Sequence, residues 1–215
     1  MLIKAGADVN IVSESGETAL TEALNKEKKD LVEILIKKGA KIFNQNMKYR
    51  DNSAFYQAIN GEKKWALEMF CDHGINLECK SEQGFTPLIY AAIKGFDEMC
   101  MYLSLRTRNI DQEDNSGKNI FVMYMLKEDY NFSDKLIKCK QLLMRGSNVN
   151  HCNSKGLTPL HFAIENKLPE KMIKFLISAG ANPHYEDFSK RDCCDKAQEL
   201  DLYENIQILH SGRCK

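Results

Sequence analysis

The sequence predicts an all-α fold in which helix–turn–helix units stack along the chain, and three recurring patterns predict it. A five-residue tail that usually begins with glycine returns every 33 to 39 residues. A four-residue motif that begins with Thr, Ser, Asn or Asp keeps step with the tail six times, and an apolar stripe at helical spacing precedes most of the tails. Because the three patterns share one period, we expect each copy to fold as the same short helical unit.

The tail motif reads Gly-Ala-Asp-Val-Asn in its clearest copy, which runs from Gly6 to Asn10. Glycine at the head of the tail can adopt the left-handed conformation that ends a helix. Each tail is therefore expected to follow the second helix of its unit. The six copies, of which the fourth is degenerate, begin at Gly6, Gly39, Gly74, Thr107, Gly146 and Gly180.

The second motif marks the start of the first helix in each unit. Its leading side chain can accept a hydrogen bond from the free N–H groups of a helix's first turn. Proline suits the next position, as in Thr86-Pro87 and Thr158-Pro159, because its missing N–H would be unpaired there. Helices are thus expected to begin within two residues of Thr18, Ser53, Thr86, Asn119, Thr158 and Asp192.

A tight turn is expected two residues before each of these helix starts. Glycine, and less easily aspartate, can adopt the left-handed backbone that such a turn requires. The residues at this position are Gly16, Asp51, Gly84, Gly117, Gly156 and Lys190. The second helix of the unit is predicted by stripes such as Val32-x-x-Leu35-Ile36 and Leu67-x-x-Phe70-Cys71.

This pattern of turn, short helix, second helix and hairpin-like loop resembles the ankyrin repeat over essentially the whole chain. The resemblance implies an all-α, ankyrin-repeat solenoid of L-shaped units with hairpin fingers that project sideways. We expect one domain, residues 1–215, whose repeats occupy residues 11–43, 44–78, 79–111, 112–150 and 151–184. Residues 1–10 match a partial repeat, and residues 185–215 match a degenerate C-terminal capping repeat.

The partial repeat at the N-terminal end leaves one face of the next unit without a neighbour. We expect five apolar side chains to be covered on one side only: Ala19, Leu20, Ala23, Val32 and Leu35. Large exposed apolar patches usually mark contact sites. Two interpretations stay open, because either upstream residues of the same protein or a partner could cover this end.

Two insertions lengthen the repeat and supply candidate binding residues. The first, at residues 44–50, lengthens the finger at Met47, Lys48 and Tyr49. The second adds six residues between two helices, within the segment at about residues 127–133, and this segment contains Tyr130 and Phe132. Insertions in repeat proteins fall in loops, and loops carry much of the binding. The alternative is sequence drift in a tolerant loop.

The resemblance also implies a concave groove lined by fingers and first helices, where a partner would bind. Mapped by repeat position, the apolar candidates for this groove are Phe85, Tyr90, Met123, Leu157 and Phe162. Aromatic anchors, as in several of these residues, often dominate binding energy. Tyr90, Met123 and Phe162 could instead pack between adjacent repeats, whereas Phe85 and Leu157 occupy a position that is usually polar.

No catalytic or metal-binding spacing occurs in the sequence. It contains no phosphate-binding loop, nucleophile elbow, HExxH zinc pair or CxxC pair. Four cysteines fall at apolar helix positions and are expected to be buried, reduced and unbridged: Cys71, Cys100, Cys139 and Cys194. We therefore predict a non-enzyme with no cofactor and no metal. A cysteine-based enzyme or redox sensor is the disfavoured alternative.

Composition narrows the class of partner. Lys+Arg and Asp+Glu both number 30, so the chain lacks the surplus of positive charge typical of nucleic-acid binding. The longest uninterrupted apolar runs have six residues, against about twenty for a membrane-spanning helix. The first ten residues carry no apolar stretch of signal-peptide length. We expect a cytoplasmic protein with reduced thiols. This expectation includes a protein that associates with the cytoskeleton or with another large assembly.

These observations lead to a prediction of function. The chain is expected to be a non-enzymatic protein–protein interaction module that acts as a scaffold or as a subunit of a larger assembly. The alternative is a regulatory inhibitor or a substrate adaptor that binds one client protein in the concave groove. Neither alternative involves nucleic acid or a membrane.

Overall fold

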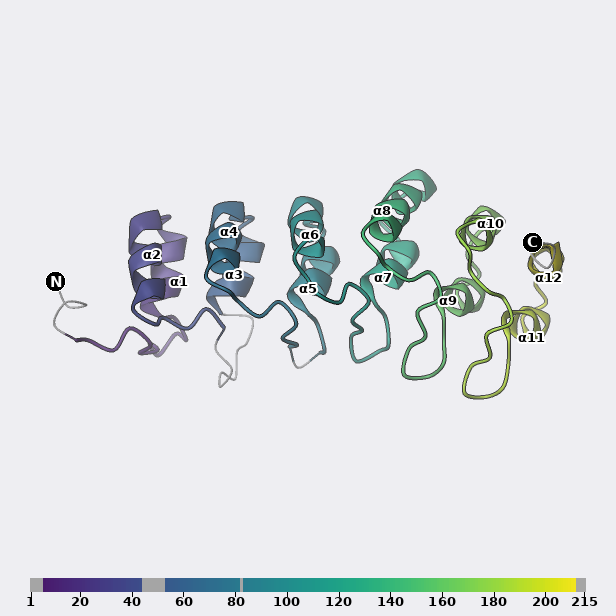
Figure 1. Cartoon of the computed structure of the whole chain (residues 1–215), viewed down its shortest axis with the longest axis horizontal. Coiled ribbons are helices and arrows are strands. Elements are labelled where there is room, and N and C mark those ends of the chain that lie inside the picture. Colours follow the sequence, from purple (N-terminus) through teal and green to yellow (C-terminus); the bar gives the residue numbers. More distant parts are fainter. Residues whose placement is uncertain (1–5, 44–52, 82, 212–215) are drawn as a thin grey trace. The chain divides into compact units, whose positions relative to one another are not determined.

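The computed structural model describes residues 6–43, 53–81 and 83–211, and within these ranges the chain is entirely helical outside its turns and loops (Figure 1). Its helices form six consecutive pairs, as the repeat predicted. The chain divides into two compact units. The N-terminal unit comprises residues 1–82 and 86–103, and the C-terminal unit comprises residues 83–85 and 104–215.

The helix pairs of each unit pack on their neighbours in that unit. In the N-terminal unit α1 packs on α3 and α3 packs on α5; in the C-terminal unit α7 packs on α9, which packs on α11. The N-terminal helices are α1 (Ala19–Asn25), α2 (Lys29–Lys37), α3 (Ala54–Asn60), α4 (Lys64–Asp72), α5 (Pro87–Lys94) and α6 (Asp97–Ser104). The C-terminal helices are α7 (Ile120–Leu126), α8 (Phe132–Met144), α9 (Pro159–Glu165), α10 (Glu170–Ser178), α11 (Cys193–Glu199) and α12 (Tyr203–Ser211).

All six predicted helix starts are confirmed. Each of the six residues is the N-cap of its helix, and each side chain accepts a hydrogen bond from a backbone N–H in the first turn. In α9, for example, Thr158 caps the N–H of His161, while the imidazole of His161 accepts the N–H of Thr158. The capping residues thus fix where each first helix begins.

The turns before these helices bring successive fingers of the C-terminal unit into contact. Gly84, Gly117 and Gly156 all have φ near +80°. A Cβ atom on Gly117 would lie 2.5 Å from Nδ2 of Asn153, which instead donates a hydrogen bond to the Gly117 carbonyl at 3.0 Å. Glycine here therefore serves both the left-handed backbone and the close approach of the next finger. Lys190 shares this conformation, with φ +61°.

The last residue of the tail motif ties consecutive repeats together. Asn150 donates from Nδ2 to the Gly180 carbonyl at 2.8 Å and accepts the Asn182 N–H at 2.7 Å. In the degenerate tail this residue is Asp111, which is buried and accepts from Asn119 Nδ2, Ser147 Oγ and the Asn148 N–H. The polar residue at this position satisfies backbone groups of the following tail, which explains why it recurs.

Of the four cysteines that the sequence predicts to be buried, three are buried in the structure, and none of the four forms a disulfide. Cys100, Cys139 and Cys194 are buried, and burial raises the pKa of the Cys139 thiol to about 12. The prediction is wrong for Cys71, which is half-buried. Phe70 takes the fully buried position of α4, and one further residue turns about 100° around the helix toward solvent.

The expectation that five apolar side chains of the N-terminal face are covered on one side only is wrong for four of them. Leu20, Ala23, Val32 and Leu35 are all buried, while Ala19 is exposed. The large apolar side chains of α2 that are exposed are Leu31, at 39 %, and Ile34, at 47 %. The helix turn explains the difference, because Val32 and Leu35 occupy the buried face of α2 and Leu31 and Ile34 lie outside it. The residues equivalent to Leu31 in three other repeats are buried: Ala66, Met99 and Met172.

None of the helices in the described ranges has the length and apolar character that crossing a membrane requires. The longest is α8, with 13 residues, where a membrane-spanning helix needs about twenty.

Candidate protein-binding surface

The finger between α10 and α11 presents two aromatic side chains to solvent. Phe188 is 76 % exposed and Tyr185 is 45 % exposed. The backbone N–H of Phe188 donates to the Lys155 carbonyl of the preceding finger at 3.2 Å, so the tip is attached to its neighbour. Single exposed apolar side chains are common on protein surfaces, so the fixed backbone together with the exposed ring makes this finger a candidate contact.

A buried carboxylate holds this finger in shape. Oδ1 of Asp187 accepts the backbone N–H groups of Ser189, at 2.7 Å, and Arg191, at 3.1 Å. Its Oδ2 lies 3.1 Å from Nζ of Lys196, which is buried and also pairs with Glu165 of α9. The finger is therefore organised before any partner arrives, which lowers the entropy lost on binding.

The same contacts shift the pKa of Asp187. Burial raises it, but the backbone N–H groups of Arg191 and Ser189 and the ammonium of Lys196 outweigh burial, so the pKa of Asp187 lies below its ordinary value. The carboxylate thus stays charged at neutral pH and contributes to stability above its unfolded-state pKa. That contribution is lost as the pH falls through the lower folded-state value.

His161 makes the C-terminal unit sensitive to mild acid. Burial lowers the pKa of its imidazole, and the nearby Lys196 ammonium lowers it further, against the opposing effects of the Arg191 carbonyl, Asp187 and Glu165. Below the ordinary histidine pKa, near 6.5, the unfolded chain binds a proton that the folded chain resists, so stability falls as the pH decreases.

We expect the urea midpoint of the chain to fall between pH 7.5 and 5.5, and His161→Asn to flatten this dependence. The matched control is His210→Asn, because His210 is exposed on α12. A pH dependence that His161→Asn leaves intact would show that another group causes it.

The structure separates the predicted groove residues into buried and half-buried sets. Tyr90 and Phe162 are buried, and the Tyr90 hydroxyl donates to Asn60 Oδ1 at 2.9 Å while its ring packs on Tyr56. Phe85, Met123 and Leu157 are half-buried. Tyr90 lies in the N-terminal unit and the other four lie in the C-terminal unit.

The second insertion is a folded segment, and part of it is helix. Tyr130 packs on Tyr124 with ring centroids 5.9 Å apart, and Nζ of Lys127 lies 4.6 Å from the Tyr130 ring centroid. Asn131 caps α8, which then begins at Phe132. The expectation that residues 127–133 lie between two helices is therefore wrong for residues 132–133. The residues predicted in the first insertion, Met47, Lys48 and Tyr49, fall outside the described residues.

Sequence reasoning missed Tyr185 and Phe188. Both residues lie in the segment that the repeat pattern predicts to be a capping repeat, residues 185–215. The sequence signal for Phe188 is its place two residues before the turn residue Lys190, where three other copies carry the polar residues Glu14, Asn115 and Ser154.

His151 and Cys152 are adjacent in the sequence, but Cys152 lacks the properties of a nucleophile. His151 Nε2 lies 2.7 Å from Oε1 of Glu113, and the adjacent Cys152 is exposed. Burial and the Glu113 charge raise the pKa of the Cys152 thiol, whereas a reactive cysteine needs a lowered pKa. The arrangement does not activate this thiol.

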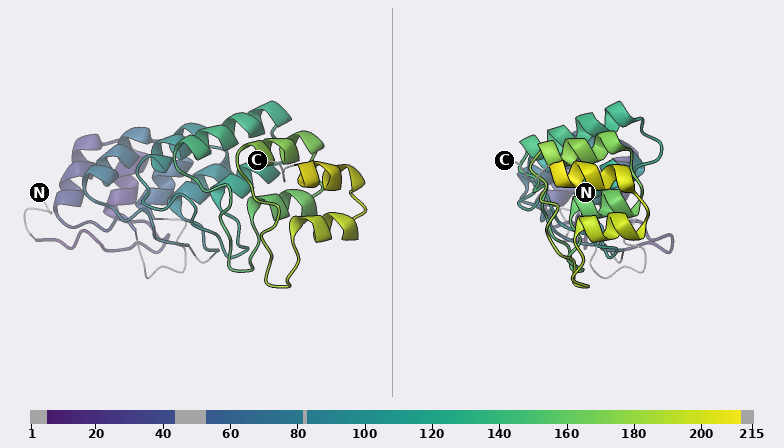
Figure 2. Two further views of the ribbon diagram at one scale, coloured as in Figure 1. Left: turned by 45° about the vertical axis from the view of Figure 1, so that its right-hand side comes forward. Right: turned by 90° about the vertical axis from the view of Figure 1, so that its right-hand side faces the viewer.

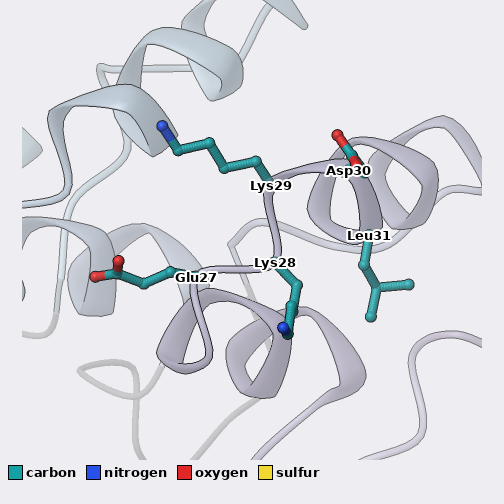
Figure 3. A pocket seen from close by; sticks show the side chains of 5 residues that line it. All are labelled: Glu27, Lys28, Lys29, Asp30 and Leu31. Atoms are coloured by element: carbon teal, nitrogen blue, oxygen red, sulfur yellow. The ribbon is translucent and has the colours of Figure 1, made fainter.

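An open pocket of about 540 Å³ adjoins the turn between α1 and α2. Figure 3 shows Glu27 and Lys29 extending to one side of the turn, and Lys28 and Leu31 to the other. Glu27 pairs with Lys63 at 2.8 Å, and Lys29 lies over the Trp65 ring. Glu27 and Lys29 therefore serve contacts with the next repeat and do not converge on a common point in the pocket.

The comparisons with known proteins agree with this architecture. A family model described as ankyrin repeats (3 copies) matches residues 1–81 and 67–187. The chain is 26 % identical over 209 residues to an ankyrin repeat and KH domain-containing protein of Caenorhabditis briggsae, covering 92 % of this chain and 8 % of that protein. It is 28 % identical over 166 residues to an ankyrin repeat protein of fowlpox virus, covering 77 % of this chain and 37 % of that one. The chain thus spans well under half of either relative.

Solved ankyrin repeat structures share the fold. The ankyrin repeat domain of Bcl-3 aligns with a TM-score of 0.76 at 21 % identity and covers 97 % of this chain and 89 % of that domain. An ankyrin repeat domain from Acinetobacter baumannii aligns with a TM-score of 0.66 at 19 % identity, covering 90 % and 96 %. At these identities the likeness concerns the fold alone.

Proposed function

The chain belongs to the ankyrin repeat family, whose domains are generally protein–protein interaction modules, and from that premise we propose that it is a non-enzymatic scaffold or assembly subunit. The finger between α10 and α11 carries the proposal, because it holds Phe188 76 % exposed on a preorganised backbone. Exposed aromatic side chains that become buried in a partner's pocket are frequent binding hot spots. We place this activity in the cytoplasm, as the sequence led us to expect.

A second candidate is an inhibitor or substrate adaptor that binds one client protein. Phe85 and Leu157 favour it, because each is half-buried directly before the N-cap residue of a first helix. A client bound there would contact the bases of the fingers. The two candidates differ in stoichiometry, since an adaptor would hold one client whereas a scaffold would hold several proteins at once.

The test is affinity purification of the full-length protein after chemical cross-linking in its source cells, followed by mass spectrometry. We expect Phe188→Ser to reduce recovery of the partner by about tenfold or more, as for loss of a hot-spot aromatic. The matched control is Tyr203→Ser, because Tyr203 is 69 % exposed on α12, away from the fingers. The size of the purified complex distinguishes a scaffold from an adaptor.

Equal recovery of the partner with both variants would contradict the role of the finger. Loss of recovery with both would indicate a general defect, which circular dichroism of the two variants checks independently.

A further inference from the structure

An open groove runs between α8 and α10 in the C-terminal unit, away from the fingers. It has a volume of about 620 Å³. The residues of α8 that line it, Phe132, Leu136 and Lys140, recur every four positions, so they share one face of that helix. The face of α10 on the other side is formed by Lys171, Lys174, Phe175, Ser178 and the adjoining Ala179.

The second insertion builds one wall of this groove. α8 has 13 residues, whereas the other second helices, α2, α4, α6, α10 and α12, have eight or nine. Aligned at the buried residues Cys139 and Leu67, α8 carries four extra residues at its start, 132–135, which add about 6 Å of helix. Figures 1 and 2 show α8 extending past α10.

The floor of the groove is apolar and only half-buried. Phe132, Leu136, Phe175 and Ala179 all line it and remain accessible to solvent. A shallow apolar channel between two parallel-running faces fits the apolar side of an amphipathic helix, a common mode of peptide recognition.

The charged residues that line the groove are all lysines. Lys140, Lys171 and Lys174 are exposed, and in the part of the chain that the structure describes no acidic residue lines the groove with them. Lys174 pairs with Glu170 of its own helix at 2.5 Å. Among the described residues, neither Lys140 nor Lys171 has an ion-pair partner. An occupant with acidic residues beside its apolar face would complement this charge.

We propose that this groove binds an acidic amphipathic helix of a partner protein, an inference that rests on the proposed interaction function but not on the finger. Apolar side chains of the helix lie along Phe132, Leu136 and Phe175. Its carboxylates pair with Lys140 and Lys171. The groove is thus a second contact surface, on the side formed by the second helices.

The test uses a labelled synthetic helical peptide of about 14 residues, or four turns, with leucines along one face and glutamates on both flanks. Its counterpart carries lysines in place of the glutamates. Fluorescence anisotropy measures binding of each peptide to the full chain. The variant is Lys140→Glu/Lys171→Glu; the control, Lys28→Glu/Lys41→Glu, changes two exposed lysines of the N-terminal unit.

We expect the acidic peptide to bind the wild-type chain and the control variant equally. The groove variant should bind it at least tenfold more weakly and should bind the basic peptide instead. Substituting Phe132 by serine should weaken binding of the acidic peptide in the wild-type background without changing the charge preference.

Three results would overturn the proposal: no binding of the acidic peptide to the wild-type chain, equal effects of the groove and control variants, or a groove variant that changes only the chain's own oligomeric state. The last would identify a second copy of this chain as the occupant. Phe188→Ser leaves the groove intact, so peptide binding by that variant separates failure of the groove proposal from failure of the finger proposal.

Discussion

Replacing Gly156 by alanine should destabilise the C-terminal unit much more than replacing Gly146 by alanine. Both glycines are left-handed, with φ +80° and +92°, and a left-handed alanine costs about 1–2 kcal/mol. At position 156 the new Cβ would also lie 2.8 Å from the Phe188 backbone nitrogen and 2.9 Å from Asp187 Cα, whereas at position 146 nothing lies within 4 Å. Overpacking against backbone adds about 1–3 kcal/mol.

Urea unfolding followed by circular dichroism measures both variants on the same scale. The expected difference in the free energy of unfolding between them is about 1–3 kcal/mol, with Gly156→Ala the less stable. Equal losses would mean that the finger at 185–191 does not pack on Gly156, and the argument for a preorganised finger would lose its basis.

Replacing Asp111 by alanine should cost about 3 kcal/mol, because it leaves buried donors on Asn119 and Ser147 without their acceptor. The Asn148 N–H loses its acceptor as well. Asn150→Ala is the matched control, since Asn150 occupies the same position of the tail motif but its two hydrogen bonds are exposed. We expect that control to cost about 1 kcal/mol.

Thermal unfolding of the two variants by calorimetry tests this difference. If Asp111→Ala proves no more destabilising than Asn150→Ala, then burial of the carboxylate contributes nothing beyond the ordinary bonds of the tail motif.

The repeat and its helix starts could be predicted from sequence because each depends on local chemistry. A side chain such as Thr158 or Asp192 caps the helix that follows it, and this hydrogen bond does not depend on tertiary packing. A glycine such as Gly117 adopts the left-handed conformation that its own turn requires. These signals recur in phase, so errors at one copy are corrected by the others.

Exposure could not be predicted as well, because it depends on which face of a helix meets which neighbour. The stripe in α2 placed Val32 and Leu35 correctly on a helix but not Leu31 and Ile34 on its solvent side. In the same way, the sequence places Phe188 at a finger tip, but only the structure shows the contacts of Asp187 and Lys196 that fix this finger. The insertion was found by its length, but its helical part followed from the cap at Asn131.

The most direct measurement places a photo-cross-linking phenylalanine derivative at position 188 of the full-length protein in its source cells, and at position 203 in a parallel sample. Both positions carry exposed aromatic residues, one on the finger and one on α12. If the protein binds its partner through the finger, position 188 should give a discrete cross-linked product and position 203 should give none. No product from position 188, or the same product from both positions, would contradict the claim.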